Sequence, residues 1–285
     1  MKGVSRWSPL LLAAALACGS AAYAQDAAAP TSATLGPDQM RVFLAKAEIV
    51  KTRRNSVGVT ESLVATLSDG RVTHDAQIQT VDVARPLFEA GAKTEINFRD
   101  SYKYNIAAYE VARLVGMDNV PMSVERRVSG ATAASTWWLD DVLFNERGRT
   151  SKKIRSPNPV RLGQQVQVMR VFDELIQNVD RTQENLLWDK SWKLWLIDHT
   201  RAFRLGHELK KLSDLDQCER GLFEGLRRLT AEALSQAVAR NLNRLEVEAV
   251  MARRDLLVRH FEDRIARRTE AAVLYTLAPP PGEGR

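Results

Sequence analysis

The chain has 285 residues, of which 45% are hydrophobic and 27% are charged, and its formal net charge is +6 at pH 7. This length is sufficient to bury a hydrophobic core, as one two-lobed domain or as two small ones. The basic residues are spread along the chain and form no block interleaved with aromatic residues, so no nucleic-acid partner is expected. The Arg-rich stretch 253–268 alternates with apolar positions and predicts the solvated face of a helix.

The first 24 residues have the three-part pattern of a secretory signal peptide. Lys2 and Arg6 precede an apolar run over residues 10–17, and small residues follow it up to the sequence Ala22-Tyr23-Ala24. The run is shorter than the roughly 20 residues that a permanent transmembrane helix needs. The pattern therefore predicts cleavage after Ala24 and export to the periplasm or the extracellular space. Once the two basic residues leave, 39 basic and 35 acidic side chains give the mature chain a charge of +4.

Cysteine usage offers one alternative to simple export. A lipoprotein site at Cys18 is the rival interpretation, which is disfavoured because Ala15 occupies the position where such sites usually carry Leu. If Cys18 leaves with the signal peptide, Cys218 is the single remaining cysteine and no internal disulfide can form. We therefore expect the fold to be held by its own core.

The first half of the mature chain predicts strands and one helix. Residues 25–38 are rich in Ala, Pro, Thr and Ser, which predicts a linker. Residues 101–116 place apolar side chains at helical spacing, and Gly116 stands where a helix would end. A turn at residues 68–70 separates two of the expected strands. The predicted strands cover residues 47–52, the two halves of 62–82, 120–130 and 134–144.

The second half is mainly helical. Residues 150–160 are rich in Lys, Arg and Pro and predict a loop, after which residues 164–178 carry apolar side chains at helical spacing. Residues 185–198 predict a β-hairpin around the turn at 189–191. Two or three amphipathic helices are expected over the stretch that follows, including 231–241 and 245–268. The order of elements predicts an α+β fold with two lobes.

Three polar residues near the hairpin form a pattern suited to phosphoryl transfer. Asp180 and Asn185 lie five positions apart before the first strand of the hairpin, and Asp198 ends the second strand. Phosphoryl transfer needs one carboxylate aimed at the attacking hydroxyl, and Asn and Asp oxygens that hold magnesium on the phosphates. The Asp/Asn spacing alone is weak, because a chain of this length contains such a pair about once by chance. Because the pair lies directly before the predicted hairpin, which ends in Asp198, the pattern is more specific for a phosphoryl-transfer site.

In this region the sequence resembles the atypical kinase group that contains the HipA-type, phosphatidylinositol 3/4-kinase and Golgi secretory-pathway kinases. The segment VFDELIQNVDRTQENLLW…WKLWLIDHTRAFR carries the resemblance most clearly, and YNIAAYEVARLVGMDNVPMSVER extends it. The resemblance implies a two-lobed protein-kinase-like fold, with a small β-rich N-lobe that contains one helix and a mainly helical C-lobe. The implied divisions are a signal peptide (1–24), a linker (25–38), the N-lobe (39–142), the C-lobe with its catalytic hairpin (143–275) and a disordered tail (276–285).

The resemblance also implies roles for individual residues. Asp180 is expected to be the catalytic base or hydroxyl-orienting residue, and Asn185 and Asp198 are expected to be metal ligands for Mg²⁺ or Mn²⁺. Arg181 is a candidate contact for Asp198 or for phosphate, although a surface arginine is an equal alternative. Gly58, in the polar loop 53–62, is a candidate for the phosphate-covering loop. The implied partners are a nucleotide, with ATP as candidate donor, and a hydroxyl-bearing protein, lipid or small molecule.

Two positions depart from the pattern of the group. Gln79 occupies the position of the lysine that usually holds the nucleotide phosphates, and Asn105 occupies the position of the glutamate that orients this lysine. The paired replacement avoids leaving one buried charge without its partner. Lys51 and Lys103 are the candidates to supply the missing positive charge from another direction.

Three hypotheses therefore stand. The first is an exported ATP-dependent kinase, as Asp180, Asn185 and Asp198 suggest. The second is a catalytically inactive kinase-fold binding protein of the cell envelope, a pseudokinase, as Gln79 and Asn105 suggest. The third is an α+β envelope protein in which Asp198 only caps a turn.

Overall fold

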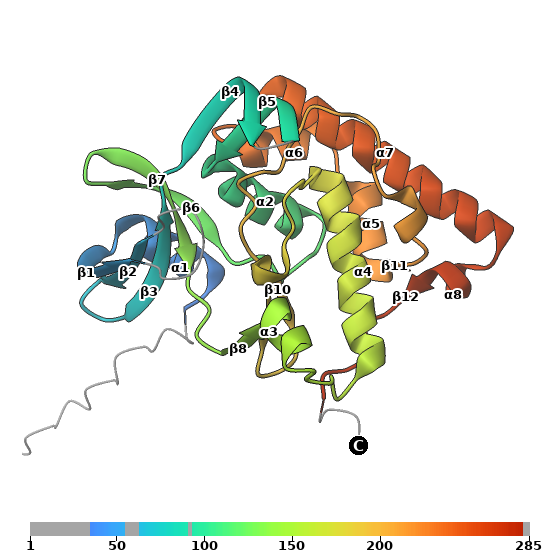
Figure 1. Ribbon diagram of the computed structural model, residues 1–285, viewed down its shortest axis with the longest axis horizontal. Helices are drawn as coiled ribbons and strands as arrows, with labels where there is room; N and C mark the ends of the chain where they lie inside the picture. Colours follow the sequence, from blue (N-terminus) through green and yellow to red (C-terminus); the bar gives the residue numbers. More distant parts are fainter. Residues whose placement is uncertain (1–34, 55–62, 91–92, 282–285) are drawn as a thin grey trace, which may run out of the picture.

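The computed structural model describes residues 35–54, 63–90 and 93–281. It has a β-rich N-lobe and a mainly helical C-lobe (Figure 1), which confirms the predicted α+β, two-lobed, kinase-like fold class. The predicted signal peptide, most of the predicted linker and Gly58 lie outside the described residues.

The N-lobe is built on a five-stranded antiparallel sheet in the order β1-β2-β3-β7-β6. The turn expected between the second and third strands forms because the Asp69 carboxylate accepts hydrogen bonds from the backbone N–H groups of Arg71 (2.9 Å) and Val72 (2.7 Å). Gly70 takes the positive φ of 84° that this turn requires. The strands are β1 (Glu48–Arg54), β2 (Leu63–Ser68), β3 (Thr73–Gln79), β6 (Ser123–Val128) and β7 (Ala131–Trp137).

Two helices accompany this sheet. Helix α2 (Lys103–Leu114) is the predicted one, and it ends before Gly116, which has a φ of 82°. Its buried face, including Ala108 and Val111, lies in the hydrophobic core of the C-lobe, so the helix joins the two lobes. Helix α1 (Pro37–Lys46) was not predicted, and it begins within the stretch assigned to the linker.

A second hairpin extends the N-lobe and was also not predicted. Strands β4 (Asp82–Ala90) and β5 (Lys93–Ser101) pair with each other and belong to a sheet separate from the five-stranded one. Leu87 and Ile96 lie opposite each other in this pair, and both side chains are exposed. In the described part of the hairpin, Phe98 is the single buried apolar residue, so the two strands lack the regular alternation of buried apolar and exposed polar residues by which strands are recognised in a sequence.

The C-lobe contains the hairpin expected at residues 185–198. Strands β9 (Leu186–Asp189) and β10 (Leu194–Leu196) are antiparallel, and β8 (Val142–Asn145) adds a third strand. The predicted strand 134–144 is thus divided between β7 and β8. The helices and short segments around this sheet are α3 (Glu146–Ser151), α4 (Pro159–Ile176), η2 (Gln183–Asn185), η3 (Leu212–Asp214), β11 (Cys218–Glu219), α5 (Arg220–Arg228), α6 (Ala231–Val238), α7 (Arg244–Arg267), α8 (Glu270–Val273) and β12 (Leu274–Tyr275).

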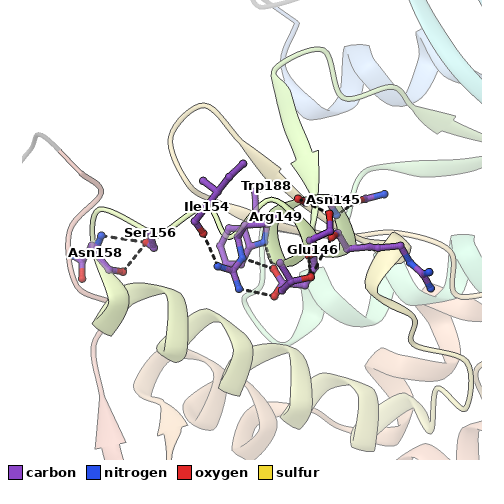
Figure 2. Close-up of polar contacts among 11 residues, drawn as sticks. Asn145, Glu146, Arg149, Ile154, Ser156, Asn158 and Trp188 are labelled. Atoms are coloured by element: carbon purple, nitrogen blue, oxygen red, sulfur yellow. Dashed lines mark hydrogen bonds and ion pairs between the residues drawn. The ribbon is translucent and has the colours of Figure 1, made fainter.

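Polar contacts attach the region before α4 to the hairpin (Figure 2). The Glu146 carboxylate accepts hydrogen bonds from Arg149 Nε (2.7 Å) and from the Trp188 indole N–H (2.8 Å) on β9. Asn145 caps α3, and Asn158 caps α4 by accepting from the N–H of Arg161 (3.0 Å). The predicted loop 150–160 therefore begins as the last turn of α3 and is fixed at both ends.

The chain end packs along α4. The Ala278 N–H donates to Gln164 Oε1 (2.7 Å), and the Tyr275 hydroxyl donates to the Gln164 carbonyl (2.6 Å). This part of the predicted disordered tail is held against the helix, and residues 282–285 lie outside the described residues. Among the helices of the described segments, none has the length and apolar character needed to cross a membrane.

Candidate functional site

The segment that carries Asp180 begins where α4 ends. Gln177 adopts a left-handed conformation with φ 46°, which turns the chain away from the helix axis. The Asp180 backbone N–H then donates to Asn178 Oδ1 (3.2 Å), and its carboxylate faces solvent with 55% of the side chain exposed. The predicted hydroxyl-orienting carboxylate is therefore accessible to a substrate.

The β9–β10 pairing brings the two predicted metal ligands together. Leu186 pairs with Leu196, so Asn185 lies beside Ile197 at the open end of the hairpin. The Ile197 N–H donates to the Asn185 carbonyl (3.1 Å), and Asn185 Nδ2 donates to the Asp180 carbonyl at 3.5 Å. Asp198 is the next residue along the chain. These contacts therefore place Asp180, Asn185 and Asp198 at the same end of the hairpin.

The Arg181 side chain stabilises this arrangement through hydrogen bonds. Its guanidinium donates to the Asp173 carboxylate on α4 (2.9 and 3.0 Å) and to the carbonyls of Ile197 (2.7 Å) and Asn185 (3.3 Å). Only 9% of the side chain is exposed. Charge-assisted hydrogen bonds of this kind are stronger than neutral ones. The geometry makes Arg181 a positioning residue and does not support the alternative of a surface arginine, whereas a contact with phosphate stays a prediction.

The Asp198 carboxyl occupies an environment that disfavours its charge. Burial raises its pKa above the ordinary aspartate range, and the nearby charge of Asp100 adds to the rise. Hydrogen bonds from Thr200, whose hydroxyl donates to Asp198 Oδ1 (3.1 Å), and the charge of Arg181 offset only part of this effect. A cation bound here would offset the cost of ionising this half-buried carboxyl.

Gln79 and Asn105 lie in direct contact between the lobes. Asn105 Oδ1 accepts a hydrogen bond from the His199 backbone N–H (2.7 Å), and this fixes the orientation of the amide. Asn105 Nδ2 then donates to Gln79 Oε1 (2.6 Å). Both side chains are buried, with 4% and 9% exposed. The two neutral amides therefore connect β3, α2 and the residue that follows Asp198, at the positions predicted for a lysine and a glutamate.

The predicted substitutes for the missing lysine are engaged elsewhere or exposed. Lys103 Nζ pairs with the Asp82 carboxylate at 2.8 Å, and Lys51 has an exposed side chain on the edge strand β1. Glu110, the acidic residue on the same helix as Asn105, pairs with Arg41 of α1 at 2.8 Å.

The oxygen donors suit a magnesium or manganese ion that shares its ligands with a nucleotide. Asp198 and Asn185 offer a carboxylate and an amide, the hard oxygen ligands that these ions prefer. Within the described segments, no group of three or more His, Cys, Asp or Glu side chains is placed to hold a metal. Mg²⁺ usually takes one or two protein oxygens together with substrate phosphates and waters. The site fits such a shared ion, and it does not fit an ion held by the protein alone.

A cavity of about 720 Å³ opens beside Asp180 and was not predicted. The β4–β5 hairpin contributes Arg99 to its lining, and the segment after Asp198 contributes Arg201 and Arg204. No sequence pattern marked these arginines as a group, because the hairpin that completes the cavity was itself missed. A larger cavity, of about 840 Å³, lies between α1 and the β2–β3 turn, away from these residues.

A fully buried arginine on α7 stabilises one wall of the 720 Å³ cavity beside Asp180. Arg253 donates to the carbonyls of Leu175 (2.9 Å), Arg204 (3.0 Å) and Gly206. Burial lowers its pKa to about 10, which still leaves the guanidinium charged at neutral pH. The contacts tie α7 to the end of α4 and to the chain that lines the cavity.

Comparison with solved structures supports the kinase-like fold. A hydra Fam20 protein solved with a sugar superimposes with a TM-score of 0.65 at 15% sequence identity, over 84% of this chain and 92% of that one. A Golgi casein kinase superimposes with a TM-score of 0.63 at 14% identity, over 86% and 79% of the two chains. The same kinase solved with Mn and ADP gives 0.61 at 14% identity, over 86% and 80%. No protein-family model and no curated protein sequence matches the chain.

The raised pKa of Asp198 leads to a prediction for stability. The pKa of Asp198 is higher in the folded than in the unfolded state. The neutral carboxyl therefore favours folding at a pH below its unfolded pKa, and this contribution to stability is lost as the pH rises through the folded pKa. Asp198→Asn keeps the acceptor for Thr200 but has no charge. Without metal, the variant should therefore unfold at a higher temperature than the wild type at pH 7.

The difference in melting temperature should vanish below about pH 4, where aspartates are ordinarily protonated. Calorimetric scans across pH measure it, with Asp263→Asn on the exposed face of α7 as the control that should show no change. An Asp198→Asn variant that is less stable than the wild type at pH 7 would contradict the assigned burial cost.

Proposed function

We propose that the chain is an exported phosphotransferase that transfers a phosphoryl group from a nucleotide to a hydroxyl acceptor with the help of Mg²⁺ or Mn²⁺. ATP is the candidate donor. Asp180 orients the acceptor hydroxyl, and Asn185 and Asp198 hold the ion on the nucleotide phosphates. The acceptor is a protein, a lipid or a small molecule, and the fold does not choose among them.

One observation carries this proposal: the Arg181 and β9–β10 contacts bring Asp180, Asn185 and Asp198 to one edge of the C-lobe. A phosphoryl-transfer site needs these three groups close to one another, because its catalysis consists mainly of positioning and electrostatic stabilisation. The accessible Asp180 carboxylate and the half-buried Asp198 carboxyl suit the two different tasks.

The residues have defined parts in the proposed reaction. The Asp180 carboxylate accepts the proton of the acceptor hydroxyl while the hydroxyl oxygen forms a bond to the γ-phosphorus. The bond from this phosphorus to the bridging oxygen breaks, and ADP leaves with the electron pair. A bound ion would supply neutralisation of the phosphate charges. Arg181 holds the Asn185 and Ile197 carbonyls in place. The side chains of Asn185 and Asp198 therefore do not have to reorganise when the ion binds.

Calorimetric titration of residues 25–285 with ATP tests the nucleotide site directly. We expect binding in the presence of magnesium or manganese, and its loss without metal or in Asp198→Ala. Asp263→Ala provides a matched control, because this aspartate is exposed on α7 and far along the chain from the site. Undiminished binding by Asp198→Ala would overturn the metal-ligand assignment, and no binding with either metal would overturn the nucleotide site.

The Gln79–Asn105 contact favours a second candidate, a kinase-fold protein that binds a ligand without catalysis. The contact replaces a charged pair by two neutral amides and leaves no lysine at this position for the phosphates. The crevice between the lobes, lined by Asn105, Asp198 and His199 among others, also has a volume of only about 10 Å³. A nucleotide would need the lobes to separate here, or would have to lie beside this crevice.

Restoring the charged pair tests whether a nucleotide lies beside Gln79. In the double variant Gln79→Lys/Asn105→Glu, the new lysine has a buried partner and reaches the phosphate side, so ATP should bind more tightly than to the wild type. Gln79→Lys alone places an unpaired charge in a buried position, and its melting temperature should fall. Titration calorimetry and thermal unfolding measure both effects. Unchanged ATP binding by a folded double variant would indicate that nucleotide does not lie beside Gln79.

Export rests on the sequence of residues 1–24, with its basic start, apolar run and small residues before Gln25. The mature protein from its native host should begin at Gln25, and N-terminal sequencing checks this. A protein that retains Met1 would contradict export by this signal, and a mature chain beginning at Cys18 would instead support the lipoprotein alternative.

A further inference from the structure

The β4–β5 hairpin holds the segment that follows Asp198. The Ser101 N–H at the end of β5 donates to the Thr200 carbonyl (2.9 Å), and Arg204 Nη1 donates to the Asn97 carbonyl (3.2 Å). The chain from Thr200 to Arg204 is therefore attached to the hairpin at both ends. This attachment crosses from the N-lobe to the C-lobe beside the proposed site.

Glu95 on β5 is the charged centre of this contact. Its carboxylate pairs with the guanidinium groups of both Arg201 and Arg204. The Arg201 guanidinium also lies over the Phe98 ring, 4.5 Å from its centroid, and only 21% of the Arg201 side chain is exposed. Two positive groups thus share a single carboxylate on the hairpin.

Arg201 lies between Glu95 and the proposed hydroxyl-orienting residue. Its Nη1 is 4.0 Å from Asp180 Oδ2, a distance longer than a hydrogen bond. In the part of the chain that the structure describes, Arg201 is the one basic side chain within 4.0 Å of the Asp180 carboxylate. The carboxylate of Glu95 therefore competes with that of Asp180 for the same guanidinium.

We infer that Glu95 is a positioning residue, which retains Arg201 on the hairpin and so leaves the Asp180 carboxylate open to an acceptor. The role in catalysis rests on the proposed phosphoryl transfer, whereas the competition for Arg201 does not. Loss of the Glu95 charge leaves Asp180 as the carboxylate within reach of Arg201, and the guanidinium closes on it.

Carboxyl footprinting measures this competition without requiring turnover. A carbodiimide and an amine label accessible carboxylates, and mass spectrometry reports the labelling rate of Asp180. In Glu95→Gln, which keeps the size of the side chain, Asp180 labelling should fall about two- to fivefold, the range expected for a partly exposed ion pair. In Glu95→Gln/Arg201→Gln it should return to the wild-type rate or exceed it. Arg201→Gln alone should also label at least as fast as the wild type.

Glu89→Gln is the matched control. Glu89 lies on the same hairpin, is exposed, and forms no ion pair among the described residues. It should leave Asp180 labelling unchanged. If the Glu95 contact only stabilised the hairpin, Asp180 labelling in the double variant would differ from the wild type at least as much as in Glu95→Gln. Recovery of the labelling rate in the double variant therefore distinguishes competition for Arg201 from a structural role.

Turnover provides a second and separate measurement. If the wild type transfers phosphate, Glu95→Gln should lower kcat about two- to fivefold with little change in KM for ATP, and the double variant should regain kcat. Unchanged Asp180 labelling in Glu95→Gln, or no recovery in the double variant, would overturn the role of Glu95. A wild type without turnover would overturn the proposed function, and the labelling result would still decide the competition for Arg201.

Discussion

The buried Arg181 guanidinium is the contact on which the candidate site depends. It joins the Asp173 carboxylate on α4 to the Asn185 and Ile197 carbonyls at the end of the β9–β10 hairpin. Without this guanidinium, these partly buried acceptors would lose their hydrogen bonds to Arg181. The relative positions of Asp180, Asn185 and Asp198 thus depend on a residue whose own donors are taken up by Asp173 and by backbone carbonyls.

A second buried guanidinium, that of Arg253, stabilises the chain near the end of α4. Arg253 reaches from α7 to the carbonyls of Leu175, Arg204 and Gly206, so the long C-terminal helix holds the chain that lines the cavity beside Asp180. The Glu95 contact then attaches the same chain to the N-lobe. Arg253 and the hairpin together hold this segment, although neither belongs to the proposed catalytic groups.

The sequence predicts the helices and strands in which buried apolar residues recur at regular spacing. It misses those that have few buried apolar residues. The β9–β10 hairpin was recognised because two short apolar runs enclose a polar turn. Helix α1 was missed because only Phe43 and Leu44 of its ten residues are buried, and β4–β5 because Leu87 and Ile96 face solvent. The amide contact between Gln79 and Asn105 could be anticipated from paired positions. The role of Arg181 could not, because it depends on the direction of a side chain.

The neutral character of the Gln79–Asn105 contact has a consequence for how the lobes respond to their surroundings. An ion pair between the lobes weakens as ionic strength rises, unless it is well buried, whereas hydrogen bonds between amides carry no net charge to be screened. The link from β3 through Asn105 to the His199 backbone should therefore be insensitive to salt. If the chain is exported as proposed, this contact between the lobes would not depend on the salt concentration of its surroundings.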